Sequence, residues 1–118
     1  MIVRRLADAS FRELPGRLSA DPLAGVDDAG AGVRLVRLAA GAERRPHRHP
    51  RSPEIVYVAE GSGRAWQDGE VQPVSAGDVV LVPLGVPHMT VPDTAMLLVC
   101  FFPDPDVATN MEELDTPA

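Results

Sequence analysis

Proline and glycine recur along the whole sequence: 12 prolines and 10 glycines are spread through 118 residues rather than gathered into one linker. They leave no long stretch with a helical period, and the apolar runs between them are short and bounded by turn residues. This pattern is typical of an all-β sandwich or barrel. Strands are expected at Val33–Leu38, Glu54–Glu60, Gly63–Gln67, Glu70–Val74, Val79–Pro83, His88–Val91 and Ala95–Phe102.

Between two of these runs lies Asp68-Gly69, which predicts a two-residue hairpin with Gly69 at positive φ. Residues 17–32 are expected to be mostly loop, with a short strand at their start. Two alternatives stay open for Val107–Leu114, namely one or two helical turns or a frayed, solvated terminus. The length suits one folding unit, so residues 1–118 are interpreted as a single domain.

Charge and composition exclude several classes of protein. Hydrophobic residues make up 45% of the chain, which argues against disorder. A formal net charge of −6 argues against binding to nucleic acid or to anionic membranes, since both need a basic surface. No apolar run is long enough to cross a bilayer, Met1–Pro15 lacks a signal-peptide core, and Cys100 is the only cysteine. A cytoplasmic protein without an internal disulfide is therefore expected.

All three histidines of the chain lie in two short segments. His47 and His49 are two residues apart, so on a strand both imidazoles point to the same side. A proline-flanked turn leads from them to Glu54 at the head of the next strand, and His88 begins another strand. Three imidazoles and one carboxylate suit one divalent transition metal such as Fe, Mn, Co, Ni, Cu or Zn. The sequence therefore predicts a metal site formed by His47, His49, Glu54 and His88.

Both segments resemble the two motifs of the cupin superfamily. The first motif, G(X)5HXH(X)3,4E(X)6G, is matched at every fixed position from Gly41 to Gly61. The second motif, G(X)5PXG(X)2H(X)3N, is matched from Gly77 onwards except that Pro92 stands in place of the final Asn, which is not a metal ligand in the family. The resemblance implies a small antiparallel barrel of the double-stranded β-helix or jelly-roll type, with the metal inside and its motifs within residues 41–92.

The resemblance also suggests a homodimer, because cupins commonly pair through added N-terminal strands. Both faces of the predicted strand Ala95–Phe102 are apolar, which favours the same state. Four arginines crowd the first motif, at positions 44, 45, 48 and 51. They could capture an anionic group of a substrate, but a solvated loop with ion pairs is the favoured interpretation.

The leading functional hypothesis is a metal-dependent enzyme that acts on a small, oxygen-rich organic molecule, and within that class we favour a dioxygenase-type oxidoreductase. Isomerase, lyase and polyketide-cyclase chemistry remain alternatives, because one fold hosts many reactions. A different class of function is a non-catalytic module that binds a small molecule and uses the metal structurally. Turnover and exchangeable metal-bound water would distinguish the enzyme from the binding module.

Overall fold

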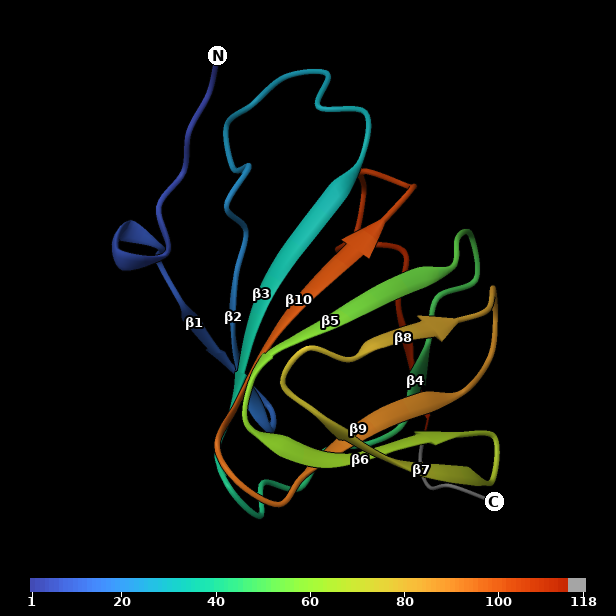
Figure 1. Cartoon of the computed structure of the whole chain (residues 1–118). Coiled ribbons are helices and arrows are strands. Elements are labelled where there is room, and N and C mark those ends of the chain that lie inside the picture. Colours follow the sequence, from blue (N-terminus) through green and yellow to red (C-terminus); the bar gives the residue numbers. More distant parts are fainter. Residues whose placement is uncertain (115–118) are drawn as a thin grey trace.

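The computed structural model describes residues 1–114, and strands form nearly all of its regular structure (Figure 1). The only helical element among these residues is a short 3-10 turn, Leu6–Asp8, so the predicted all-β class is confirmed. No helix in the described part of the chain has the length and apolar character needed to span a membrane. The strands are β1 (Arg12–Leu14), β2 (Arg17–Ala20), β3 (Gly32–Leu38), β4 (His47–Arg48), β5 (Glu54–Glu60), β6 (Ser62–Gln67), β7 (Glu70–Ser75), β8 (Val79–Val82), β9 (His88–Pro92), β10 (Met96–Phe102) and β11 (Glu112–Glu113).

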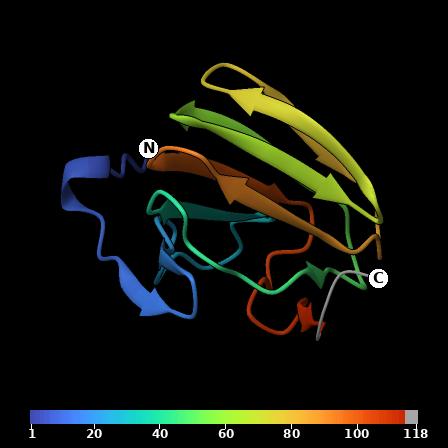
Figure 2. The ribbon, with the colours of Figure 1, turned by 90° about the horizontal axis from the view of Figure 1, so that it is seen from below.

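Two antiparallel sheets face each other across the core (Figure 2). The first has six strands in the order β1-β2-β3-β10-β5-β8, and the second has five in the order β11-β4-β9-β6-β7. Neighbours in each sheet are often distant in sequence, as expected for a jelly roll. The cupin-type architecture is thus confirmed, but backbone hydrogen bonds do not close the two sheets into one continuous barrel.

Alternation along two strands places the core between the sheets. In β5 the buried residues are Glu54, Val56 and Val58, which point inward at every second position. In β10 the side chains of Met96, Leu98, Cys100 and Phe102 are buried on the same side. This face contributes most of one apolar core cluster, which Val36 and Leu38 of β3 extend.

Each strand predicted from the sequence agrees with an observed strand to within one residue at either end. The predicted hairpin is also confirmed, because Gln67 pairs with Glu70 and the two residues between them have positive φ, 47° at Asp68 and 91° at Gly69. The short strand expected at the start of residues 17–32 is β2, which pairs with β3.

Gly61 marks the point where the chain passes from one sheet to the other, between β5 and β6. Its φ of +85° lies in the left-handed region, and a Cβ at this position would overlap the carbonyl oxygen of Ala95. Only glycine fits both conditions without strain. The last glycine of the first motif therefore fixes the corner between β5 in the six-stranded sheet and β6 in the five-stranded sheet.

The C-terminal segment corrects both alternatives considered for Val107–Leu114. It forms neither helical turns nor a solvated end: residues 107–109 make a turn, β11 pairs with β4, and the side chains of Val107 and Asn110 are buried. The physical reason is that this segment packs against the opening between the sheets, where the polar groups of Asn110 all find partners.

Candidate metal centre

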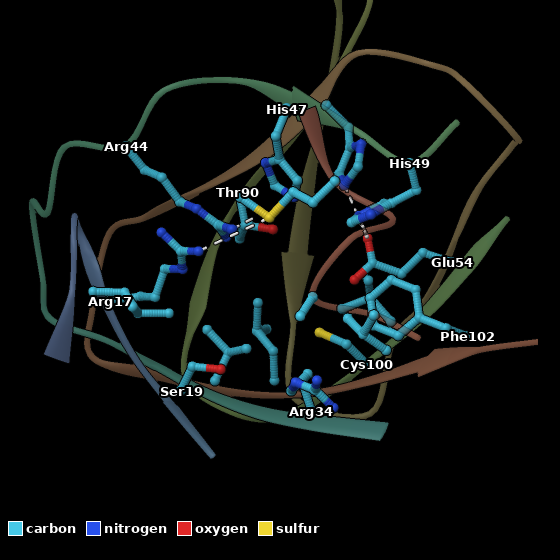
Figure 3. A pocket seen from close by; sticks show the side chains of 18 of the residues that line it. Arg17, Ser19, Arg34, Arg44, His47, His49, Glu54, Thr90, Cys100 and Phe102 are labelled. Atoms are coloured by element: carbon cyan, nitrogen blue, oxygen red, sulfur yellow. Dashed lines mark hydrogen bonds and ion pairs between the residues drawn. The ribbon is translucent and has the colours of Figure 1, made fainter. Parts of the chain in front are cut away.

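Three strands bring the four predicted ligands together at one end of the space between the sheets (Figure 3). His47 lies in β4 and pairs across the sheet with His88, the first residue of β9. His49 follows β4, and Glu54 begins β5 after the proline-flanked turn. One donor atom from each of the four residues can be chosen so that all of them lie within 4.8 Å of one another. The spacing seen in the sequence thus corresponds to one cluster in space.

The cluster is deeply buried. The exposed fractions of the four residues are 3–5%. An ionised carboxylate in such a position is costly unless opposite charge or hydrogen bonds compensate it. Glu54 is the only carboxylate of the cluster, so the three imidazoles or a bound cation must supply that compensation.

Hydrogen bonds to the backbone fix the orientation of two of the rings. Nδ1 of His49 donates to the carbonyl oxygen of Asn110 at 2.7 Å, and Nδ1 of His88 donates to that of Val86 at 3.0 Å. A carbonyl oxygen can only accept, so each Nδ1 carries a proton. In the neutral ring, Nε2 therefore presents a lone pair.

Both of these Nε2 atoms point at one oxygen of Glu54. The distance to Oε1 is 2.9 Å from His88 and 3.3 Å from His49. With neutral imidazoles, three lone-pair atoms would face one another, which is unfavourable without a positive charge between them. Either extra protons on the rings or a metal cation satisfies the arrangement, and Nδ1 bonds of this kind are the usual orienting contacts of metal-binding histidines.

The pKa values of His47 and Glu54 and the unpaired ring nitrogens of the cluster agree with a site for a cation. Burial and, next, the charge of Arg44 strongly lower the pKa of His47, which keeps its imidazole neutral and able to bind metal. Burial would raise the pKa of Glu54, but its close contacts with the imidazoles of His49 and His88 outweigh burial and hold that pKa well below its usual range. Nδ1 of His47 and Nε2 of His49 are buried without a hydrogen-bond partner. The residues present therefore fit a divalent transition metal.

A cavity of about 280 Å³ opens beside the cluster. Apolar residues of β3, β5 and β10 line part of it, and four arginines, one of them on β3, contribute as well. Cys100 also lines it, and burial, followed by the negative charge of Glu54, raises the pKa of its thiol. The volume lies just below the range of roughly 300–1,000 Å³ common for drug-sized ligands, so the space suits a small molecule.

Three of the four arginines in the first motif, Arg44, Arg48 and Arg51, differ in their surroundings. Arg48 forms a bidentate ion pair with Glu112, and Arg51 pairs with Asp104, so the favoured interpretation of surface ion pairs describes these two. Arg44 instead lies along the cavity, with Nη2 3.5 Å from Nε2 of His47 (Figure 3). Surface ion pairing therefore does not account for Arg44.

Sequence reasoning missed Asn110, which is fully buried and supports the cluster. Its backbone oxygen accepts the bond from His49, while its side chain accepts from the amide of Arg51 at 2.7 Å and donates to Ser52 at 2.9 Å. These contacts span about sixty residues of sequence. No spacing or periodicity in the sequence points to them.

The chain is thus a small jelly roll of two antiparallel sheets with an internal cluster of three histidines and one glutamate that could hold a metal. The model of the cupin domain family matches residues 34–102, more than half of the chain. The chain belongs to the cupin family. The sequence has no significant match among curated proteins. The interpretation of residues 1–118 as one cupin domain stays a prediction.

Proteins of known structure with the same fold differ in the reactions or ligands that their descriptions name. A Streptomyces Pac13 variant with uridine has a TM-score of 0.80 at 17% identity, covering 100% of this chain and 93% of that chain; Pac13 is described as a nucleoside dehydratase. Ectoine synthase from P. lautus gives 0.79 at 22%, covering 100% and 93%. Oxalate decarboxylase of Lactobacillus farciminis, in complex with formate, gives 0.77 at 19%, covering 92% and 34%. At these identities the likeness establishes the fold alone.

Proposed function

We propose that this cupin is a metal-dependent enzyme that acts on a small organic molecule bound in the cavity. His47, His49, Glu54 and His88 would hold one divalent transition metal, of the set Fe, Mn, Ni, Co, Cu or Zn. Four protein ligands leave coordination positions open for water or substrate in an octahedral site. The metal would supply Lewis acidity and, if redox-active, a centre for chemistry with dioxygen.

The observation that carries this proposal is the convergence of Nε2 of His49, Nε2 of His88 and Oε1 of Glu54. Both rings are turned by Nδ1 bonds to backbone carbonyls, so their lone pairs meet the carboxylate oxygen. A divalent cation held by these residues would replace the repulsion between their lone pairs with favourable coordination. Hydrogen bonding to Asn110 and Val86 also holds the rings in place before a metal arrives, which reduces the reorganisation that binding requires.

Dioxygenase-type oxidation is the reaction we favour within this class. If the four ligands are occupied by a metal, the cavity lining offers no further carboxylate, imidazole, phenol or lysine amine among the described residues. Cys100 does not replace them, because burial keeps it as a thiol. Dehydration and isomerisation usually rely on a side chain that titrates near neutral pH as general base. Metal-centred oxidation has no such requirement, so this lining suits it better.

Elemental analysis of protein purified without added metal tests the proposed site. We expect about one transition metal per chain, lost in a His49→Ala variant. Glu54→Gln should bind metal more weakly, and Glu70→Gln is its control, because Glu70 is an exposed carboxylate on β7. Wild-type protein that contains no metal and takes up none of the six candidate ions on titration would refute the site.

The reaction class is tested with iron-loaded protein, a dioxygen electrode and two small chelating substrates, acetylacetone and catechol. Dioxygen consumed in step with substrate loss supports the dioxygenase assignment. Substrate loss without dioxygen consumption would refute it and place the protein among lyases or isomerases. Tight binding of both compounds without turnover would refute catalysis and indicate a binding module.

We also propose that the chain forms a homodimer through the outer face of the six-stranded sheet. Ile55, Tyr57, Val79, Leu81 and Phe101 are each 41–65% exposed there. Cross-strand pairing makes them contiguous, because Phe101 lies opposite Ile55, Ile55 opposite Leu81, and Tyr57 opposite Val79. The area contains no charged residue, and a second copy offers the same uncharged, apolar surface, as a two-fold symmetric interface requires.

Light scattering at micromolar concentration tests the dimer. We expect the mass of two chains for the wild type and of one chain for Leu81→Asp, since an interface of roughly 1,000 Å² or more would bury the new charge. Val71→Asp is the matched control, because Val71 is 53% exposed on β7 of the other sheet. A monomeric wild type, or equal dissociation by both variants, would refute this interface.

A further inference from the structure

Arg44 is placed where its charge is poorly compensated. Its side chain runs along the cavity, its Nε is buried without a hydrogen-bond partner, and it forms no ion pair with any acid among residues 1–114. Its Nη2 lies 3.5 Å from Nε2 of His47. A guanidinium in such surroundings is costly unless an anion is bound beside it.

A second arginine faces the same part of the cavity. Arg17 extends from β2 toward Arg44 in Figure 3, and only 8% of its side chain is exposed. Burial and then the charge of Arg17 lower the pKa of Arg44 to about 10, so the two like charges affect each other. Glu113 is 3.8 Å from Arg17 but is itself 43% exposed, which weakens the compensation it gives.

The charges around the cavity are unequal in number. The lining contains Arg12, Arg17, Arg34 and Arg44 but one acid, Glu54. Arg34 has its own partner, Asp21, at 3.4 Å. A divalent cation at the proposed metal site would make the surplus of positive charge larger still. The cavity therefore has the electrostatic character of an anion-binding site.

The lining also has an apolar part. Val36 of β3, Val56 of β5 and Leu98 and Phe102 of β10 contribute to it, and Arg34 of β3 also lines the cavity. A ligand that satisfies both the arginines and this apolar part has a charged group at one end and an apolar body at the other. Guanidinium groups match carboxylates with paired, charge-assisted hydrogen bonds.

We propose that the cavity binds a small carboxylic acid, with its carboxylate between Arg44 and Arg17 and its apolar body against β3, β5 and β10. This inference rests on the proposed function, since it names the substrate class of the same cavity. Binding in this orientation places the apolar body next to the His47, His49, Glu54 and His88 cluster. Arg44 and Arg17 act as positioning residues for the substrate, and neither takes part in a bond-making step.

Calorimetric titration with three acids, propionate, isobutyrate and benzoate, each beside its own uncharged amide, tests the inference. For the wild type we expect each acid that fits to bind at least about tenfold more tightly than its amide. Arg44→Gln should weaken binding of the acids by about 10- to 100-fold and leave the amides unchanged. Arg64→Gln is the matched control, because Arg64 is exposed on β6 and pairs with Asp93 at the surface.

Each titration is run on zinc-loaded and on metal-free protein, with metal content measured separately. If no metal binds, the proposed function fails, while the metal-free titrations still decide whether the arginines recognise carboxylates. Retention of full acid affinity by Arg44→Gln would overturn the inference, and so would an equal loss in Arg64→Gln. Acids that bind no better than their amides, or inorganic phosphate that binds more tightly than every acid, would also overturn it.

Discussion

Replacing Asn110 with alanine tests how far the C-terminal segment supports the metal centre. The substitution removes two hydrogen bonds, from the Arg51 amide to Oδ1 and from Nδ2 to the Ser52 hydroxyl. The bond to Ser52 is buried, the bond from the Arg51 amide is partly buried, and Asn110 has no exposed surface at all. Leaving the Ser52 hydroxyl without this partner costs about 1–3 kcal/mol, and losing the partly buried bond from the Arg51 amide costs about 1–2 kcal/mol.

Together these losses lower the free energy of unfolding of the metal-free protein by roughly 2–5 kcal/mol, a large part of the 5–15 kcal/mol typical of a domain. The second expected effect is on metal affinity. The side chain of Asn110 anchors the backbone oxygen that orients His49. Loosening an outer-shell contact of this kind weakens metal binding by about 10- to 100-fold.

Urea unfolding of metal-free protein followed by circular dichroism measures the first effect, and competition with a chelating dye measures the second. Ser75→Ala is the control, because Ser75 is exposed on β7, and its substitution is expected to cost no more than about 0.5 kcal/mol. If Asn110→Ala were as stable as the control and bound metal as tightly as the wild type, the supporting role assigned to Asn110 would be wrong.

Three further predictions concern the ligands, pH and the corner between the sheets. In a zinc competition assay, His49→Ala should lose metal binding while Glu54→Gln keeps a weaker affinity, because the amide retains an oxygen donor but not the charge; the reverse order would contradict the ligand assignment. The pKa of His47 lies far below the ordinary value of about 6.5, so unfolding takes up a proton, and stability of the metal-free protein falls by about 1.4 kcal/mol per pH unit between about pH 6 and pH 5. Urea unfolding should show this slope, and a His47→Gln variant with an undiminished slope would contradict it. Gly61→Ala should cost roughly 2–4 kcal/mol in the same assay, and Gly69→Ala, which also has positive φ but open space around it, about 1–2 kcal/mol; equal costs would mean that the contact with Ala95 has no effect.

The strands and the cluster were predictable because local sequence patterns determine them. Alternation from Glu54 through Val56 and Val58 fixes which side of β5 faces the core. The dipeptide Asp68-Gly69 specifies its own hairpin, since both residues tolerate positive φ. His47, Glu54 and His88 begin strands that the prolines delimit, and His49 follows His47 by two residues, so their convergence followed from few assumptions.

The role of Asn110 was not predictable. Its partners lie about sixty residues away in the sequence, and the residues around it are mostly polar, as in a solvated terminal segment. The arginines show a similar limit. Arg44 and Arg48 are four residues apart in the same motif, and only packing against β2 and β9 distinguishes a residue of the cavity from a surface ion pair. Sequence spacing identified the atoms that face one another across the cluster, but not the residues that enclose them.

The contact between His49 and Asn110 also has a consequence for the biogenesis of the protein. Translation produces the first three ligands well before β9 and the C-terminal segment, so a nascent chain that ends before them has neither His88 nor the carbonyl that orients His49. The complete set of ligands and the orienting carbonyl is therefore present only once these segments have been made, and the proposed metal would then come from the pool that the folded chain encounters. Because nitrogen and oxygen sites of this kind bind several divalent ions in the same order of affinity, the supply in that pool determines the occupant. Cells grown with different metal supplies should then yield the same folded protein with different ions in it.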